Sequence, residues 1–329
     1  MEWSVEFTHV RERLGSEAGV RSALTWAAHE TTTSRKVNMR TRSTVLALSA
    51  VLAMACAAPA LAASDNGTPP VTLPAMEHKG LAAIGLTADQ RLVEFDVDKP
   101  SKSVPARRVS GLTGDAKLVG IDFRVQNERL YGVGDRGGVY TLDTGNARAT
   151  KVSQLTVALS GTFFGVDFNP AANRLRVISD TGQNLRHNID DAAAAPGTAV
   201  DGPLTNPGTP PATASGVTGA AYTNNDLNAA TATTLFDLDT LADRISLQSP
   251  ANAGTLAPTG SLGINAVPDA GFDIYSSPRT GTNRGFATIS TGGSYALYEI
   301  DVLNGRATSR GAFPGRTQVT DIALPPNQG

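Results

Sequence analysis

The chain has 329 residues, of which 40% are hydrophobic and 18% charged, a composition that builds a packed core and argues against disorder. Its 28 Lys and Arg residues nearly balance its 30 Asp and Glu residues, which gives a formal net charge of −2. Proteins that bind nucleic acid usually carry an excess of basic residues, so this balance argues against a nucleic-acid partner.

The first recognisable segment is residues 39–62, which has the three parts of a secretory signal peptide. Arg40 and Arg42 give it a positive start, residues 44–57 are almost purely apolar, and Ala60-Leu61-Ala62 matches a cleavage site. The apolar run is shorter than the roughly 20 residues that cross a membrane. We therefore expect an exported protein with no membrane span after cleavage.

Cleavage near Ala62-Ala63 would leave a secreted or periplasmic chain, with residues 1–38 as a spurious upstream extension and residues 63–80 as a flexible, Pro-rich lead-in. It would also remove Cys56, the only cysteine. The mature chain then has no disulfide, thiolate nucleophile or Cys-based metal site. Lipidation of Cys56 is the less favoured alternative, because the residues before it match such a site poorly.

Residues 81–325 repeat one pattern, which predicts a single all-β domain. Each copy starts with a short apolar segment, usually containing Gly-x-Asp, and continues through further short strands separated by turns. A period near 40–50 residues with about four short strands per unit is typical of a β-propeller. The glycines that mark the copies are at positions 120, 165, 219 and 271, which are 45, 54 and 52 residues apart.

The two ends of this domain each hold part of one copy. Residues 81–109 supply its last three strands, and residues 319–324 supply its first strand. Pairing between the two ends closes a ring and covers sheet edges that would otherwise bind other chains. We count five blades; six is the alternative, because residues 190–216 and 241–266 have room for extra strands.

The most specific motifs lie in the second complete copy and after it. They read FFGVDFNP at 163–170, NRLRVISDTGQNLR at 173–186, AYTNN at 221–225, TLFDLD at 234–239 and PANAGTL at 250–256. With these motifs, nearly the whole mature chain resembles an exported bacterial family called domain of unknown function 4394. The resemblance implies a propeller-type repeat domain, and it brings no activity that could be transferred to these residues.

The aspartates of the Gly-x-Asp segments are the first candidate site. The first strand of each propeller blade lines the central channel, so Asp122, Asp167 and Asp273 could converge there, joined by Asp321. Clustered carboxylates suit calcium, which takes about six to eight oxygen ligands. The alternative is that each aspartate caps its own turn or binds the backbone of the next blade, which the repetition favours. Ala221 interrupts the series.

A second candidate site consists of polar side chains in the second complete copy and the copy that follows. Arg174 and Arg176 share one face of a predicted strand, and a guanidinium binds a carboxylate or phosphate through paired hydrogen bonds. The cluster fits an anionic ligand or an acidic partner surface; salt bridges between blades are the alternative. The candidate ligand-binding residues are Asp167, Asn169, Arg174, Arg176, Gln183, Asn184, Arg186, Asn188, Tyr222 and Asn224.

Two further features favour structural roles. Asp96, Asp143, Asp239 and Asp301 each end a predicted strand before a turn, which predicts side-chain-capped turns. His187 lies on a predicted strand of the polar cluster, where a single histidine is usually a satisfied strand residue.

Three functions remain open from the sequence. The first is a binding or scaffold protein that presents loops to an envelope or extracellular protein, a glycan or a small ligand. The second is a calcium-dependent hydrolase of lactonase type, with metal and carboxylates in the channel. The third is a structural domain with no small ligand. The lack of thiols and of any catalytic motif favours binding over catalysis. Calcium is the one cofactor we consider, and we expect a monomer.

Overall fold

The computed structural model describes residues 80–103, 107–190, 197–315 and 317–328. The predicted upstream extension, the signal peptide and nearly all of the lead-in lie outside these residues. The described strands run from Ala82 to Ala323, close to the limits of the predicted domain. In the described part of the chain, no helix has the length and apolar character needed to cross a membrane.

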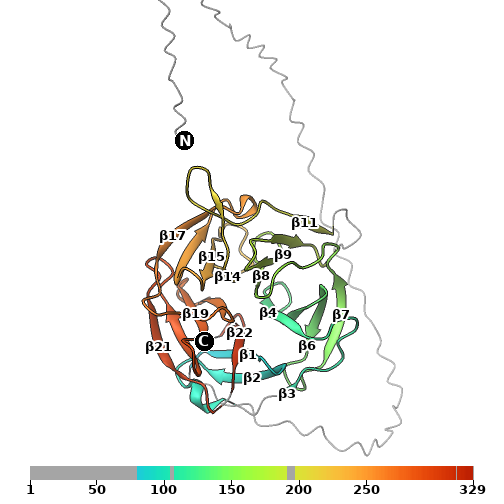
Figure 1. The fold of residues 1–329 in the computed structure, drawn as a ribbon. Helices are drawn as coiled ribbons and strands as arrows, with labels where there is room; N and C mark the ends of the chain where they lie inside the picture. The colour runs from blue at the N-terminus through green and yellow to red at the C-terminus, as the bar shows by residue number, and fades with distance from the viewer. Residues whose placement is uncertain (1–79, 104–106, 191–196, 316, 329) are drawn as a thin grey trace, which may run out of the picture. The chain divides into compact units, whose positions relative to one another are not determined.

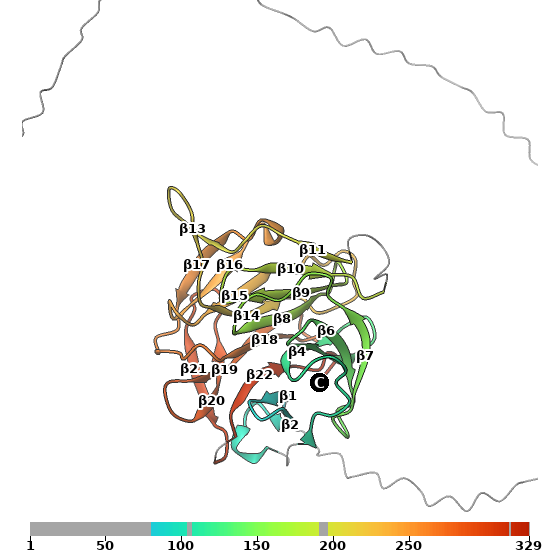
Figure 2. The same ribbon diagram turned by 45° about the vertical axis from the view of Figure 1, so that its right-hand side comes forward.

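Five antiparallel sheets of four strands each form a ring, which confirms the all-β propeller with five blades (Figures 1 and 2). We number the blades 1–5 in the order of their inner strands, starting from the sheet that contains both ends of the domain. Blade 1 consists of β22 (Val319–Ala323), β1 (Ala82–Thr87), β2 (Arg91–Asp96) and β3 (Arg107–Arg108). Blade 2 consists of β4 (Leu118–Arg124), β5 (Arg129–Gly134), β6 (Gly138–Leu142) and β7 (Ala149–Gln154).

The other three blades follow in the same manner. Blade 3 consists of β8 (Phe164–Asn169), β9 (Arg174–Ser179), β10 (Asn184–His187) and β11 (Thr198–Val200). Blade 4 consists of β14 (Val217–Tyr222), β15 (Leu235–Asp239), β16 (Arg244–Gln248) and β17 (Leu256–Ser261). Blade 5 consists of β18 (Gly271–Ser276), β19 (Asn283–Ser290), β20 (Tyr295–Ile300) and β21 (Ala307–Ala312).

The remaining elements are short and do not build a sixth blade. A two-stranded hairpin, β12 (Thr205–Asn206) and β13 (Ala212–Thr213), occupies part of the long connection between blades 3 and 4. Two 3-10 turns are η1 (Pro100–Lys102) and η2 (Ala251–Ala253). Of the two ranges that left a sixth blade open in the sequence, the described part of 190–216 holds β11 and this small hairpin, and 241–266 holds β16 and β17 of blade 4.

The ring closes as predicted, because β22 pairs antiparallel with β1. Ile84 lies opposite Ala323, and Leu86 lies opposite Asp321. The last strand of the domain thereby becomes the innermost strand of the sheet that contains the first.

The glycines of the inner strands are there because neighbouring inner strands approach very closely. A Cβ atom added to Gly165 would lie 2.6 Å from the backbone nitrogen of Ala220, and one added to Gly271 would lie 2.3 Å from Cα of Asp321. No ordinary side chain tolerates such contacts, and glycine within a strand commonly marks a close approach of another backbone. The repeated Gly-x-Asp motif thus places a carboxylate two residues beyond a tight contact between blades.

Apolar side chains pack between successive blades and form the core. Tyr131 of blade 2 meets Phe168 of blade 3 edge-on, with ring centroids 5.1 Å apart. Phe95 of blade 1 meets Phe313, which follows blade 5, at 5.0 Å. Such aromatic pairs contribute about 0.5–1.5 kcal/mol beyond the area they bury.

The aspartates at strand ends cap turns, as the sequence predicts. Asp143 Oδ1 accepts hydrogen bonds from the backbone N–H groups of Gly145 and Asn146, and Asp301 Oδ1 accepts one from Leu303. Asp96 and Asp239 make equivalent bonds to the turns that follow them. Their carboxylates are therefore used locally.

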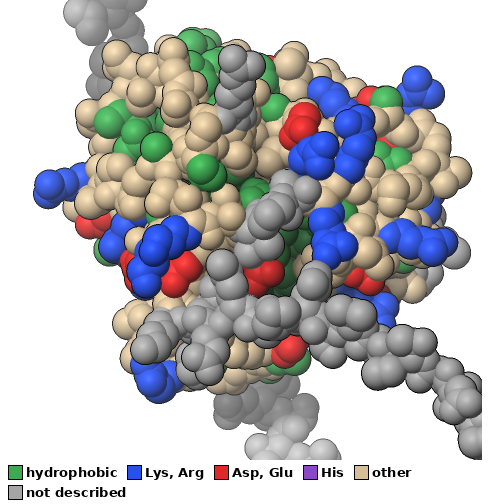
Figure 3. Space-filling model, turned by 90° about the horizontal axis from the view of Figure 1, so that it is seen from below, with side chains coloured by type: hydrophobic (Ala, Val, Ile, Leu, Met, Phe, Trp, Pro, Cys, Tyr) green, Lys and Arg blue, Asp and Glu red, His purple; other side chains and the backbone are tan. Residues whose placement is uncertain are grey.

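The surface seen from below carries mixed charge (Figure 3). On this face, Lys and Arg side chains form several separate groups, with Asp and Glu side chains and hydrophobic side chains between them.

Candidate metal centre

Three aspartates on the inner strands converge in the channel. Asp122 on β4, Asp167 on β8 and Asp273 on β18 are 3%, 1% and 1% exposed. Each offers a carboxylate oxygen that lies within 4.8 Å of the oxygens offered by the other two. The structure therefore brings together the three residues that the sequence nominated as metal ligands.

Two members of this acidic triad also fasten neighbouring blades. Asp122 Oδ2 accepts a hydrogen bond from the backbone N–H of Phe168 in blade 3, with a distance of 2.7 Å. Asp273 Oδ2 accepts one from Leu324, next to blade 1, at 2.6 Å. Asp122 and Asp273 thus also play the structural part considered from the sequence as the alternative to metal binding, because each forms a hydrogen bond with the backbone of the next blade.

Asp321 continues this arrangement in blade 1, and Ala221 interrupts it in blade 4. Asp321 Oδ2 accepts a hydrogen bond of 2.7 Å from the backbone N–H of Ile121 in blade 2. Ala221 occupies the equivalent place on β14, so blade 4 lacks an inner-strand carboxylate. Among the described residues, the triad and Asp321 are thus four carboxyl groups buried along the channel.

Asp167 differs from the others because one of its oxygens has no partner. A backbone hydrogen bond involving Tyr222 acts on this carboxyl group. Its Oδ1 atom is buried and has no hydrogen-bond partner among the described residues. A buried polar atom left unpaired costs about 1–3 kcal/mol. An oxygen in this condition, inside an acidic triad, is suited to a bound ion.

The electrostatics of the triad require a positive charge or protons. Burial raises the pKa of Asp122 and of Asp167 well above the ordinary value, and the charges of the neighbouring aspartates raise it further. Burial raises the pKa of Asp273 to about 7. The main groups that lower these pKa values are backbone N–H groups. The triad is therefore neutralised by protons or by a bound cation.

The donor set fits a hard cation. All three donors are carboxylate oxygens, the ligand type that calcium prefers, with none of the nitrogen or sulfur ligands typical of structural zinc. Calcium–oxygen distances are about 2.3–2.6 Å, so two oxygens on opposite sides of one ion lie about 5 Å apart. Three oxygens that lie within 4.8 Å of one another can therefore contact one such ion. The buried triad could thus hold a metal.

The polar cluster of blade 3 forms a different structure. Arg176 is 1% exposed, and its guanidinium donates to four side chains: Asn184 Oδ1 at 2.6 Å, Asp201 Oδ2 at 2.7 Å, Asn252 Oδ1 at 2.9 Å and Tyr222 Oη at 3.1 Å. Arg186 forms two further hydrogen bonds with Asp201. The two arginines already share one carboxylate, and Asp201 directly follows β11 of the same blade. This is a salt-bridge cluster within blade 3, linked to blade 4 through Tyr222 and Asn252, rather than an open anion site.

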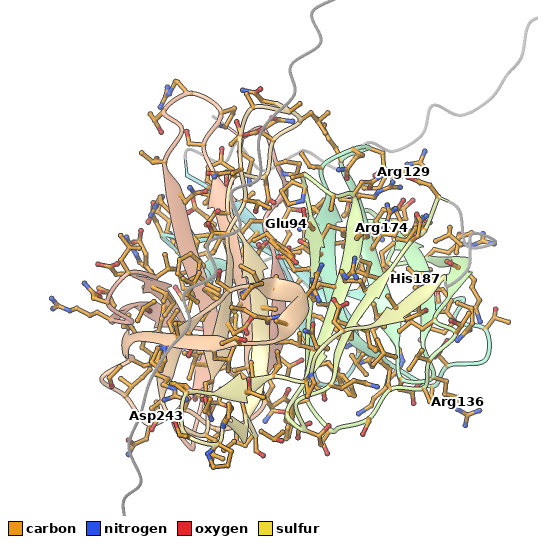
Figure 4. All side chains as sticks on the ribbon, turned by 90° about the horizontal axis from the view of Figure 1, so that it is seen from above. Glu94, Arg129, Arg136, Arg174, His187 and Asp243 are labelled. Atoms are coloured by element: carbon orange, nitrogen blue, oxygen red, sulfur yellow. The ribbon has the colours of Figure 1, made fainter. Side chains whose placement is uncertain are left out.

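The other candidates of this cluster make mostly local contacts. Arg174 and His187 come from adjacent strands of blade 3 and are labelled in Figure 4. Arg174 donates to the backbone carbonyls of residues 172 and 173, and His187 lies between Ser153 and Thr198. Asn169 and Gln183 form hydrogen bonds with nearby backbone groups, and the Asn224 side chain accepts a hydrogen bond from Asn283. The side-chain oxygen of Asn188 is buried and has no partner among the described residues. These residues do not surround one common point.

Sequence reasoning missed Asp201 and Asp237. Asp201 receives both arginines but lies in a connection without any motif. Asp237 is fully buried on β15, and neither of its carboxylate oxygens has a partner among the described residues. Alternation along this strand could have revealed it, because Asp237 shares a face with Leu235 and opposes Ser246 in the sheet.

A cavity of about 140 Å³ lies at one mouth of the channel. Its wall comes from residues at the starts of β4, β8 and β22, from the turn after β1 and from the residues just before β18. Four of the five blades therefore contribute to it. Lys117 and Asp269 are the charged residues of its lining.

Comparisons with known proteins identify a family and distant structural neighbours. A family model described as "Domain of unknown function (DUF4394)" matches residues 91–323, and no curated protein matches the chain. A protein of unknown function from Bacteroides thetaiotaomicron is 14% identical, with a TM-score of 0.42, and an auxiliary nutrient binding protein from Bacteroides ovatus is 9% identical, with a TM-score of 0.38. The matches cover 75% and 72% of this chain, which spans 66% and 57% of those two chains.

Proposed function

The chain belongs to the DUF4394 family, a domain of unknown function, and on that premise we propose that it is an exported binding scaffold whose channel aspartates hold a calcium ion. The observation that carries this proposal is the buried acidic triad. Its oxygens lie within 4.8 Å of one another, and Asp167 Oδ1 has no partner among the described residues. Calcium supplies both the missing charge and the missing contact.

The burial of the triad supports a structural ion over a catalytic one. A catalytic metal keeps one coordination position open to substrate, whereas a structural metal is enclosed by protein. Each aspartate of the triad is at most 3% exposed, and Asp122 and Asp273 are bonded to the backbone of the next blade. An ion here would join blades 2, 3 and 5 at the centre of the ring, and recognition of partners would fall to the loops at its ends.

Export would place the proposed site in a compartment where external calcium can reach it. The pattern at residues 39–62 supports secretion or transfer to the periplasm. Calcium sites of extracellular modules bind with dissociation constants of about 10⁻⁴–10⁻³ M, which external calcium can fill. A ring of small sheets without cysteine would gain its central cross-link from the metal.

The test is thermal unfolding of the full mature chain from Ala63, first with a chelator and then with calcium, magnesium or zinc. A ligand that binds only the native state at 100 times its dissociation constant stabilises it by about 2.7 kcal/mol. We expect a calcium-selective rise in Tm that is lost in Asp167→Asn. Asp301→Asn, an exposed turn aspartate whose Oδ1 bond an asparagine keeps, is the control. No response of the wild-type protein to any cation would refute the calcium site.

A calcium-dependent hydrolase is the second candidate, because the carboxylates do converge within reach of one ion. Metal and carboxylate together would polarise a carbonyl or phosphoryl group and activate water. Calcium-loaded wild-type protein and Asp167→Asn would be compared on lactone and phosphoester substrates. Turnover that depends on calcium and on Asp167 would establish the hydrolase; its absence would leave the scaffold.

A further inference from the structure

We propose that the cavity at the channel mouth is the ligand site of this scaffold and binds a small apolar amino acid as its zwitterion. This inference rests on the proposed binding function and names the class of ligand.

The cavity is a preformed part of the ring. Gln90 of blade 1 reaches across to blade 2, where its Oε1 accepts from the backbone N–H of Leu118 at 2.6 Å and its Nε2 donates to the carbonyl of the same residue at 3.1 Å. This pair of hydrogen bonds between neighbouring blades fixes one wall. Val119, Phe163 and Phe164, which are only partly buried, supply apolar surface around the opening. A site of this kind needs little rearrangement to bind a ligand.

The size of the cavity restricts the ligand to one small molecule. Sites for drug-sized ligands occupy about 300–1,000 Å³, whereas this cavity measures about 140 Å³. Nucleotides and oligosaccharides exceed this volume, and a single aliphatic amino acid is of the right order.

The two charged groups of the lining are complementary to a zwitterion. Burial raises the pKa of Asp269, and the nearby charge of the exposed Lys117 opposes that rise, although the two groups form no direct ion pair. Asp269 is partly buried and is hydrogen-bonded to the Tyr295 side chain. An α-carboxylate would bind the Lys117 ammonium, and an α-ammonium would bind the Asp269 carboxylate. Charged hydrogen bonds of this kind are the stronger ones in proteins.

The apolar wall completes the recognition. A side chain that extends from the α-carbon would lie against Val119, Phe163 and Phe164. Burial of apolar surface contributes about 0.8 kcal/mol for each methylene group. A leucine or valine side chain should therefore bind more tightly than glycine, which offers the same two charges without the apolar group.

The test is calorimetric titration of the calcium-loaded mature chain with L-leucine, L-valine and glycine. Leucinamide, which lacks the carboxylate, and 4-methylpentanoate, which lacks the ammonium group, are the matched analogues. We expect leucine to bind, and each analogue to bind at least tenfold more weakly. Lys117→Met should remove the preference for leucine over leucinamide, and Asp269→Asn the preference over 4-methylpentanoate. Lys99→Met, at an exposed lysine outside the cavity, should bind leucine like the wild type.

The outcomes separate this inference from the proposed function. If calcium raises Tm but no amino acid binds, the ligand assignment is wrong and the scaffold stands. If a monosaccharide binds in place of leucine, and Phe163→Ala abolishes that binding, the cavity is a sugar site and the zwitterion is excluded. Each variant is compared with the wild type in the calcium-dependent Tm, so that loss of folding is distinguished from loss of binding.

Discussion

The buried aspartates predict that the metal-free protein becomes less stable as the pH rises through neutrality. Burial raises the pKa of Asp273 from 3.8 to about 7. Between these values the native state keeps a proton that the unfolded chain has released, so the stabilisation is complete below pH 3.8 and is lost as the pH rises through about 7. At about 1.4 kcal/mol per pKa unit, this one carboxyl group accounts for about 4 kcal/mol. Asp122 and Asp167, whose pKa values burial also raises, act in the same direction.

The assay is urea denaturation at pH 5 to 8, with a chelator and with calcium. We expect the free energy of unfolding to fall with pH in the chelator, and calcium to reduce this fall because the ion replaces the protons. Asp273→Asn should make this fall smaller in the metal-free protein, with Asp122 and Asp167 accounting for what remains. His187 acts oppositely, since burial lowers its pKa and the native state gains stability as the pH rises through the ordinary value of 6.5. A stability that is flat or rises from pH 5 to 8 in the chelator would refute the reasoning.

Two further predictions concern buried contacts, one within blade 3 and one between blades 3 and 4. Arg176→Met should lower the free energy of unfolding, measured by urea denaturation, by about 3–5 kcal/mol, because it leaves the Asp201 carboxylate, which is 5% exposed, without one of its two guanidinium partners. A loss below 1 kcal/mol would show that this ion pair is not needed for stability. Gly165→Ala should cost about 1–3 kcal/mol, because its Cβ would lie 2.6 Å from the backbone nitrogen of Ala220. Gly293→Ala, whose Cβ would have no atom within 4 Å, is the control and should leave stability unchanged.

The features that could be predicted from sequence are those that a local repeat determines. Gly-x-Asp recurs because each inner strand meets its neighbour in the same way, so Asp122, Asp167 and Asp273 could be identified as a set from their shared motif alone. Ring closure followed from two incomplete copies, since an unpaired β1 edge would be exposed. In both cases a residue's neighbours in space are fixed by its position within the repeat.

The polar cluster could not be interpreted in this way, because its partners are not part of the repeat. The Arg176 guanidinium binds Asp201, 25 residues further on, and Asn252, 76 residues further on. From the sequence, Arg174, Arg176 and Arg186 looked equivalent and available to an anion. Burial and one shared carboxylate distinguish them: the carboxylate lies just after β11 of the same blade, and Tyr222 and Asn252 of blade 4 bind Arg176.

The cavity at the channel mouth was missed for a related reason. Lys117 and Asp269 are separated by three blades along the chain and carry no motif. They become neighbours only because inner strands start at the same end of the ring. Asp269 precedes β18 by two residues and Lys117 precedes β4 by one, so similar places in two repeats bring opposite charges together.

The pairing of β22 with β1 has a consequence for the order of events during biosynthesis. The strand that completes the first sheet begins at Val319, so it leaves the ribosome after every other described strand of the ring. Until then blade 1 lacks its innermost strand, the edge of β1 has no partner, and the Asp321 bond to blade 2 cannot form. A prematurely terminated polypeptide would thus display an open edge that proteases and chaperones can recognise. Pairing of β22 with β1 therefore removes the exposed edge only once the whole ring has been synthesised.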